Sequence, residues 1–167
     1  LAPVVVSTSN VTDANFGIEQ LPTPSNLTAA SQANPGGTVS APVPATTFGA
    51  TDPDGGTVTD IKITGLPTNA TSITINGTLY TSGFPITVPT NANGEPTQPI
   101  LVDPINGAVV VGIPYSAVDN AGKESPATGL ANVPFGTVGI SGTVFNDVNG
   151  LTDNTVNGTG LGNPSST

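Results

Sequence analysis

Cysteine, histidine, methionine and tryptophan are all absent from the 167 residues of this chain. Without histidine and cysteine, a Ser-His-Asp triad, a Cys-His dyad and a zinc site built on these ligands are excluded. The chain has only two cations, Lys62 and Lys123. Two positive charges cannot neutralise the roughly six to ten phosphates of a duplex-DNA footprint, which excludes nucleic acid as a partner. No run of 18 apolar residues occurs, so we expect no membrane insertion.

The residues that remain leave little room for catalysis. Hydrolysis by a pair of carboxylates is the one mechanism that survives the missing residue types. The three glutamates, Glu19, Glu95 and Glu124, all lie in polar, turn-rich stretches. None has the apolar surroundings that raise the pKa of a catalytic acid. We therefore expect a protein that is not an enzyme.

Acidic residues, glycine and proline are what the chain does contain. Eleven acidic residues against two cations give a net charge of −9, which favours divalent cations as ligands. The 21 glycines and 17 prolines break regular structure, yet 35% of the residues are hydrophobic. Intrinsic disorder usually combines low hydrophobicity with high charge, so we expect a folded, loop-rich chain. The scarcity of Lys and Glu, with abundant Thr, Asn, Gly and Pro, favours an extracellular location.

Short β-branched runs separated by turn residues dominate the sequence and predict an antiparallel β-sandwich. In Val58–Thr64, polar and apolar residues alternate with period two, which is typical of a half-buried strand. Asn76-Gly77 predicts a two-residue hairpin turn of type I′. The predicted strands are Val4–Ser7, Thr46–Ala50, Val58–Thr64, Ser72–Ile75, Thr78–Thr81, Ile86–Val88, Ile100–Val102, Ala108–Val118 and Thr137–Phe145.

Composition also suggests how the chain is organised. The segment 18–37 is polar, holds three prolines and is typical of a linker or an irregular leading segment. Strand signals recur over 38–138, which is long enough for one seven-strand sandwich. The last residues, after Phe145, consist almost entirely of turn formers and cannot form a core.

Both ends of the chain carry motifs of another module. Ile140–Gly150 (ISGTVFNDVNG) resembles the opening strand and loop of B-type repeats, prealbumin-like β-sandwich modules of bacterial surface proteins. Asn10–Ile18 (NVTDANFGI) resembles the last strand of the same module. The middle carries Ala50–Gly56 (ATDPDGG) and Tyr115–Gly122 (YSAVDNAG), and resembles a bacterial cadherin-like or immunoglobulin-like repeat. The combined order resembles the long repetitive cell-surface adhesins of gliding bacteria.

This resemblance implies an all-β fold cut out of phase with its modules. It places the last strand of a preceding B-type repeat at 1–20, a linker at 21–37, and a complete cadherin-like or immunoglobulin-like sandwich at 38–138. The first strand and loop of a following B-type repeat then occupy 139–167. Neighbouring repeats of the same chain are the implied partners, and the implied location is the bacterial cell surface.

Acidic residues next to strand ends indicate two candidate calcium sites. Asp52, Asp54 and Asp60 place three carboxylates within nine residues, and Asp119 ends a strand-like run that could reach the same end of the sandwich. Calcium takes six to eight oxygen ligands from carboxylates, amides and carbonyls. A plain Asp-Pro-Asp-Gly turn explains the same residues. The second candidate comprises Asp147, Asn149 and Asp153, where an Asn-Gly turn is again the alternative and where B-type repeats usually carry more acids.

The expected function is non-enzymatic: an adhesive and structural stalk segment, with calcium as the cofactor. This hypothesis predicts no pocket with converging polar groups in 38–138. The alternative is a carbohydrate- or peptide-binding module that uses loops at one end of the sandwich, with 89–96 as the candidate surface. We also expect Tyr115 to pack at a corner with its hydroxyl bonded to the backbone.

Overall fold

The computed structural model describes residues 19–137 and 139. Within these residues the fold is all-β, and its one helix is a short 3₁₀ turn, η1 (Ala45–Thr47). The strands of the first half are β1 (Thr23–Pro24), β2 (Leu27–Thr28), β3 (Gln32–Ala33), β4 (Ala41–Pro42), β5 (Ala50–Thr51) and β6 (Val58–Ile63). Those of the second half are β7 (Ala70–Ile75), β8 (Thr78–Tyr80), β9 (Ile86–Pro89), β10 (Ile100–Pro104), β11 (Val109–Asp119) and β12 (Gly129–Gly136).

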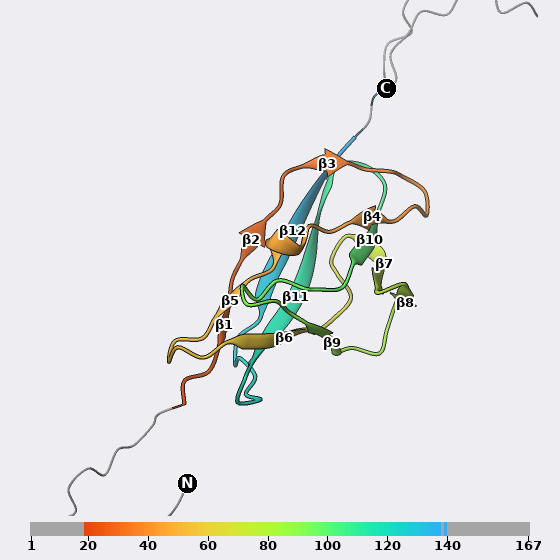
Figure 1. Ribbon diagram of the computed structural model, residues 1–167. Coiled ribbons are helices and arrows are strands. Elements are labelled where there is room, and N and C mark those ends of the chain that lie inside the picture. The colour runs from red at the N-terminus through yellow and green to blue at the C-terminus, as the bar shows by residue number, and fades with distance from the viewer. Residues whose placement is uncertain (1–18, 138, 140–167) are drawn as a thin grey trace, which may run out of the picture.

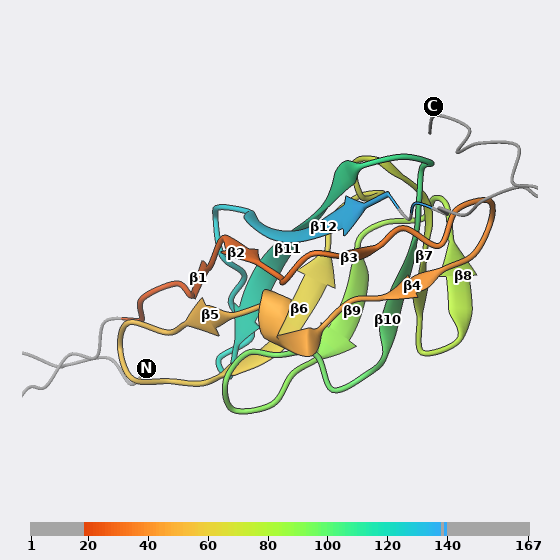
Figure 2. The ribbon, with the colours of Figure 1, turned by 90° about the horizontal axis from the view of Figure 1, so that it is seen from above.

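Two main sheets face each other, as Figures 1 and 2 show. The larger sheet has the order β2-β12-β11-β6-β9, with β3 also on β12, and the smaller has the order β4-β10-β7-β8. A short ladder joins β1 to β5. All pairings are antiparallel except those of β2 and β3 with β12, which are parallel. The architecture is therefore the expected all-β, sandwich-like arrangement of antiparallel sheets.

Alternating residues of both sheets build the core. On β12 every second residue is buried, namely Gly129, Ala131, Val133 and Phe135. The facing sheet contributes Ile73 and Val102, each fully buried. This alternation follows from the period of two in a strand, which sends successive side chains to opposite faces. The core therefore lies between the two main sheets.

Tyr115 closes one end of this core. Its side chain is fully buried on β11, and its ring meets that of Phe48 edge to face at 5.2 Å. The Tyr115 hydroxyl lies 2.6 Å from the carbonyl oxygen of Ser25 and 2.8 Å from that of Gly49, and accepts a bond from the Gly49 N–H at 3.2 Å. The prediction that this hydroxyl is bonded to backbone is confirmed. It connects β11 with two segments far away in sequence.

Several strand predictions agree with the structure. β6, β7, β8, β9, β10 and β11 lie within one or two residues of their predicted bounds. Asn76 and Gly77 have φ values of 48° and 80°, as a type I′ turn requires. Thr46–Ala50 is wrong as a strand, because Thr46 and Thr47 belong to η1 and only Ala50 belongs to a strand, β5. β12 was not predicted, since glycines bound it and Pro134 interrupts it. Val4–Ser7 lies outside the described residues, as does nearly all of Thr137–Phe145.

The segment 21–37, expected to be a linker, is instead part of the sandwich. It contains β1, β2 and β3, which pair with β5 and β12. Of its three prolines only Pro24 lies in a strand, the short β1, and Pro22 and Pro35 lie outside the strands. A short edge strand tolerates the missing N–H of a proline. The partial strands of neighbouring modules expected at 1–20 and 139–167 lie almost entirely outside the described residues.

The described chain starts at one end of the long axis and leaves at the other (Figures 1 and 2). β1 lies near the first end, and β3 and the end of β12 lie near the second. None of the helices in the described part of the chain is long and apolar enough to cross a membrane.

Candidate metal centre

A tight turn after β5 presents two carboxylates at the end of the sandwich where the described chain begins. Asp52 follows β5 directly, and its carbonyl oxygen accepts a hydrogen bond from the Gly55 N–H at 3.3 Å. Gly55 has a φ of 90°, a conformation that side chains disfavour. The turn places the Asp54 carboxylate against the Gly56 N–H, at 3.3 Å. The turn therefore reverses the chain and also presents the carboxylate of Asp54.

Asp119 approaches the same end from the last residue of β11. Its Oδ1 accepts hydrogen bonds from the backbone N–H groups of Ala121, at 2.8 Å, and Lys123, at 2.7 Å. The next residue, Asn120, accepts a bond from the Thr57 N–H at 2.9 Å through its own Oδ1. The turn after β11 is thereby held against the turn after β5.

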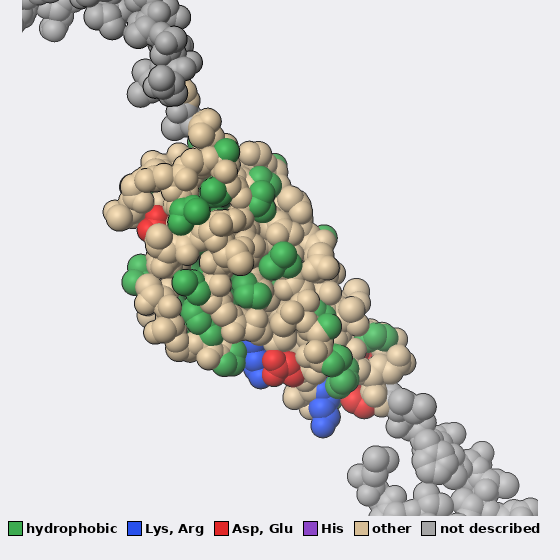
Figure 3. Space-filling view, turned by 180° about the vertical axis from the view of Figure 1, so that it is seen from behind, with side chains coloured by type: hydrophobic (Ala, Val, Ile, Leu, Met, Phe, Trp, Pro, Cys, Tyr) green, Lys and Arg blue, Asp and Glu red, His purple; other side chains and the backbone are tan. Residues whose placement is uncertain are grey.

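The residues that precede β1 complete the cluster. The backbone N–H of Gln20 donates to Asp54 Oδ2 at 2.8 Å, which brings Glu19 beside the turn. Partial desolvation, followed by the negative charges of Asp54, Asp119 and Asp52 and by contact with the Asp119 side chain, raises the pKa of Glu19. We call these four acids, Glu19, Asp52, Asp54 and Asp119, the acidic pole. Figure 3 shows charged side chains gathered toward this end of the molecule.

Electrostatics within the acidic pole are uneven. Burial, followed by contact with Asp54 and its charge, raises the pKa of Asp52. The Gln20 N–H holds the pKa of Asp54 below its usual value. Asp52 therefore takes up a proton more readily, while Asp54 keeps its charge. Such crowding of like charges favours binding of either a proton or a cation.

The acidic pole contains polar atoms that lack partners. Asp119 is 1% exposed, and its Oδ2 is buried without a hydrogen bond. Asp52 Oδ1 is likewise buried and unbonded. A buried carboxylate oxygen without a partner is costly, so each of these oxygens is suited to accept a ligand. A side chain at Gly56 would collide with Asp52 Oδ2 and Asn120 Oδ1, so glycine keeps the space between them open.

These oxygens match the donor set of calcium, a hard cation that prefers carboxylate and amide oxygens. Within residues 19–137 and 139, however, no three acids are already arranged closely enough to ligate one ion. Binding at the acidic pole would therefore draw carboxylates together from their metal-free positions. Asp119, held by two backbone N–H groups, is the fixed member of the group.

The predicted ligands divide into three groups. Asp52, Asp54 and Asp119 are brought together by the structure. Asp60 is not one of the four acids of the acidic pole, and its Oδ2 accepts a bond from its neighbour Thr59 at 2.9 Å. Asp147, Asn149 and Asp153 lie outside the described residues. Glu19 was missed because the sequence placed it in a preceding module. Only the pairing of the segment 21–37 with the sandwich reveals its position.

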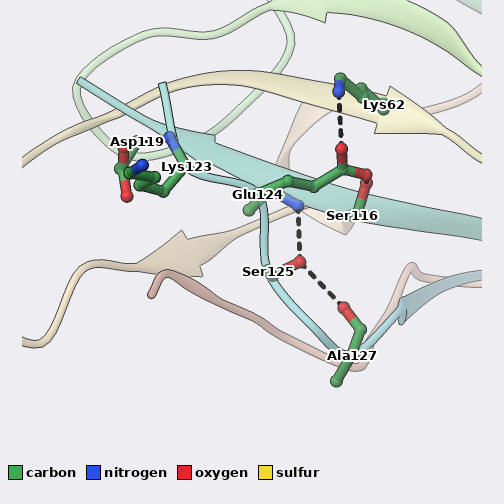
Figure 4. A network of polar contacts seen from close by, with 8 residues as sticks. Lys62, Ser116, Asp119, Lys123, Glu124, Ser125 and Ala127 are labelled. Atoms are coloured by element: carbon green, nitrogen blue, oxygen red, sulfur yellow. Dashed lines mark hydrogen bonds and ion pairs between the residues drawn. The ribbon is translucent and has the colours of Figure 1, made fainter. Parts of the chain in front are cut away.

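A second charged network lies five residues beyond Asp119 (Figure 4). Lys62 Nζ is 2.6 Å from Glu124 Oε2, and the Ser116 hydroxyl donates to Glu124 Oε1 at 2.6 Å. The hydrogen bonds from Lys62 and Ser116 lower the pKa of Glu124. Ser125 accepts from the Ala117 N–H at 3.0 Å and donates to the Ala127 carbonyl at 2.8 Å. This network is saturated internally and offers no free oxygen comparable to that of Asp119.

The loop 89–96, the candidate surface for a glycan or peptide, is also bonded to itself. Asn91 Oδ1 accepts the N–H groups of Asn93 and Glu95, at 2.9 and 3.1 Å, and Asn91 Nδ2 donates to Glu95 Oε2 at 2.8 Å. These bonds leave few of its polar groups free for a ligand.

A cavity of about 350 Å³ lies beside this loop. Apolar side chains such as Val43, Phe48 and Ile100 line most of it, and Thr97 and Gln98 are its polar members. It contains no ionisable side chain.

Comparison of the chain with protein-family models, with curated proteins and with solved structures finds no match. The arrangement of its residues is therefore the basis for assigning a function.

Proposed function

We propose that this chain contributes a calcium-stabilised β-sandwich module to the stalk of a secreted or cell-surface bacterial adhesin. The observation that carries the proposal is the buried, unbonded Oδ2 of Asp119 among three further carboxylates. The chain has only two cations, and among the described residues neither lysine forms an ion pair with Asp119 or Asp52. A divalent cation would neutralise this charge and satisfy these oxygens.

The four acids would have different parts in holding calcium. Asp119, fixed by the N–H groups of Ala121 and Lys123, would supply the rigid ligand. Asp52 and Asp54 come from one turn and would supply two more. Asn120 adds an amide oxygen at the same end, as its bond to Thr57 indicates. Calcium would bring no chemistry beyond charge neutralisation and cross-linking of these segments.

Glu19 extends this role to the chain that leads into the sandwich. It precedes β1, so a cation shared by Glu19 and Asp119 would fasten the leading residues to the end of β11. A segment held at such a junction reduces bending between successive modules. The described chain also starts and leaves at opposite ends, which suits an extended array (Figure 1). In tandem arrays, stability depends on each module and on its contacts with neighbours. The cadherin-like or immunoglobulin-like character of the sandwich and the cell-surface location are parts of this proposal.

Calcium titration of the full chain tests the proposal. We expect binding by calorimetry, and at a calcium concentration about 100 times Kd a stabilisation of about 2.7 kcal/mol over the EGTA sample. For a domain of this size that amounts to a rise of about 10 °C in the unfolding midpoint. Magnesium should act weakly, because it demands a smaller and more regular ligand shell.

Matched variants assign the effect to the acidic pole. Asp52→Asn should weaken the calcium response, whereas Asp60→Asn removes an equal charge outside the cluster and should leave it unchanged. Calcium without effect on the midpoint, or equal losses in both variants, would reject the site.

A further inference from the structure

The first strands of the sandwich run parallel to its last strand. β2 pairs with β12 through Leu27 opposite Ala131 and Thr28 opposite Asn132. β3 continues along the same strand, with Gln32 opposite Phe135 and Ala33 opposite Gly136. β12 leads to the far end of the molecule, whereas β1 lies at the near end (Figures 1 and 2). A force that pulls the two ends of the chain apart therefore acts in opposite directions on the two sides of this pairing, which we call the seam.

Hydrogen bonds cross this seam outside the short strands as well. The Ala29 N–H donates to the Asn132 carbonyl at 2.9 Å, and the Asn34 N–H donates to that of Gly136 at 2.8 Å. The Leu130 N–H donates to Asn26 Oδ1 at 2.8 Å. The contact between the leading segment and β12 therefore extends from Asn26 to Asn34, well beyond its two pairs of strand residues.

Both ends of the leading segment are fastened to other parts of the fold. Near its start, the Ser25 carbonyl lies 2.6 Å from the Tyr115 hydroxyl, and the Ser25 N–H donates to Gly49 at 2.8 Å. Gly129 lies so close that an added Cβ would be 2.7 Å from the Ser25 oxygen. At its end, Asn34 is 5% exposed and its amide donates to the carbonyls of Ile105 and Gly107, at 2.8 and 2.7 Å.

We propose that residues 25–34 and β12 form a mechanical clamp, which resists a pull on the two ends of the chain in shear. A pull draws residues 25–34 toward the acidic pole and β12 toward the opposite end. In a parallel pair the hydrogen bonds are evenly spaced and slant between the strands, so a pull along the strands loads them together. In a hairpin opened from one end, the same bonds break one at a time. Residues 25–34 thus raise the force needed to unfold the module, although they contribute little to its core.

This inference rests on the proposed stalk role only in assuming that force reaches the module through its ends. The clamp itself uses none of the acidic residues. Its behaviour can therefore be measured in EGTA, where the proposed calcium site contributes nothing.

Single-molecule stretching in two directions tests the clamp without weakening the fold. In one arrangement the full chain is held through its two ends. In the other it is held through Thr38→Cys and its C-terminal end, which peels β3 away from β12. Thr38 is exposed and the chain has no other cysteine, so the attachment is unique. We expect a several-fold higher unfolding force in the first arrangement, because forced unfolding follows the barrier along the pulled direction. Equal forces would overturn the proposal.

A pair of proline variants locates the resistance. Ala29→Pro removes the N–H that bonds Asn132 and should lower the end-to-end unfolding force. Thr78→Pro disturbs the β7–β8 hairpin, which neither end of the chain loads, and should leave that force unchanged even where it lowers the melting temperature. A force that follows melting temperature in both variants would overturn the clamp.

Calcium dependence of the unfolding force is a separate readout. Its absence would count against the acidic pole and leave the direction dependence intact.

Discussion

Two groups of carboxylates at the end of β11 have opposite surroundings. Glu124 has both oxygens occupied, one by Lys62 and one by Ser116. Asp119, five residues earlier, has one oxygen bonded to backbone and one buried without a partner, and its neighbours in the acidic pole are acids. The pKa of Glu124 is lowered by its partners, whereas those of Glu19 and Asp52 are raised.

The difference shows that, in a chain with only two cations, a single lysine determines whether a carboxylate is already neutralised. Where Lys62 is present, the carboxylate closes a structural network and needs nothing more. At the acidic pole the same charge stays uncompensated, and folding retains repulsion that a ligand can relieve. A carboxylate cluster can therefore be classed as structural or as ligand-binding by asking which of its oxygens are already bonded.

The largest expected effect on the calcium response comes from replacing Asp119 with its neutral amide, asparagine. In Asp119→Asn the amide oxygen can still accept the N–H groups of Ala121 and Lys123, so the turn after β11 should persist. The ligand oxygen is lost, and we expect most of the calcium-induced rise of about 10 °C to disappear. Thermal unfolding in EGTA and in calcium measures both quantities. A full calcium response in this variant would remove Asp119 from the site.

A smaller effect is expected from breaking the saturated network. Glu124→Gln removes the charge that pairs with Lys62 and weakens the bond from Ser116. Because both side chains of the ion pair are partly exposed, at 29% and 42%, we expect a loss of about 0.5–1 kcal/mol. That corresponds to a fall of about 2–4 °C in the unfolding midpoint, with the calcium response unchanged. A reduced calcium response would mean that the two groups of carboxylates are coupled.

The smallest effect is in the pH dependence of stability. Groups with raised pKa values, Glu19 and Asp52, oppose folding when charged, so the metal-free protein should gain stability as pH falls through their raised values. Glu124, with a lowered pKa, contributes stability above its unfolded value near 4.5 and loses it as pH falls further.

Together these groups predict a shallow stability maximum in mild acid for the metal-free chain. With calcium the maximum should vanish, because protons then compete with the cation. Denaturant unfolding at a series of pH values, with and without calcium, tests this. Parallel curves in the two conditions would contradict it.

Most of the longer strands could be predicted from sequence because their signals depend on residues that are close together in the chain. The alternation in β6 and the Asn76-Gly77 turn are properties of neighbouring residues, and both agree with the structure. β12 was missed because Pro134 suggests a break, whereas the strand tolerates it opposite Val110 on β11. The edge strands β1 to β3 were missed because two-residue strands exist only through their partners.

The candidate site was predictable to the extent that its residues were near in sequence. Asp52 and Asp54 share one turn, and Asp119 was inferred from the end of a strand. Glu19 could be placed only after the leading segment was seen to return to the sandwich. Asp60 was included because it is close in sequence, but in the structure its carboxylate accepts a hydrogen bond from the Thr59 hydroxyl.

The bond between Tyr115 and Ser25 has a consequence for how the chain matures. Its two residues are 90 positions apart, and Asn26 waits for Leu130, 104 positions later. A chain that emerges from a ribosome N-terminus first must therefore carry β2 and β3 without their partner β12 until nearly the whole module is out. These strands are only two residues long, so they offer little edge for wrong pairing during that delay. Completion of the module is thus coupled to complete emergence of its chain.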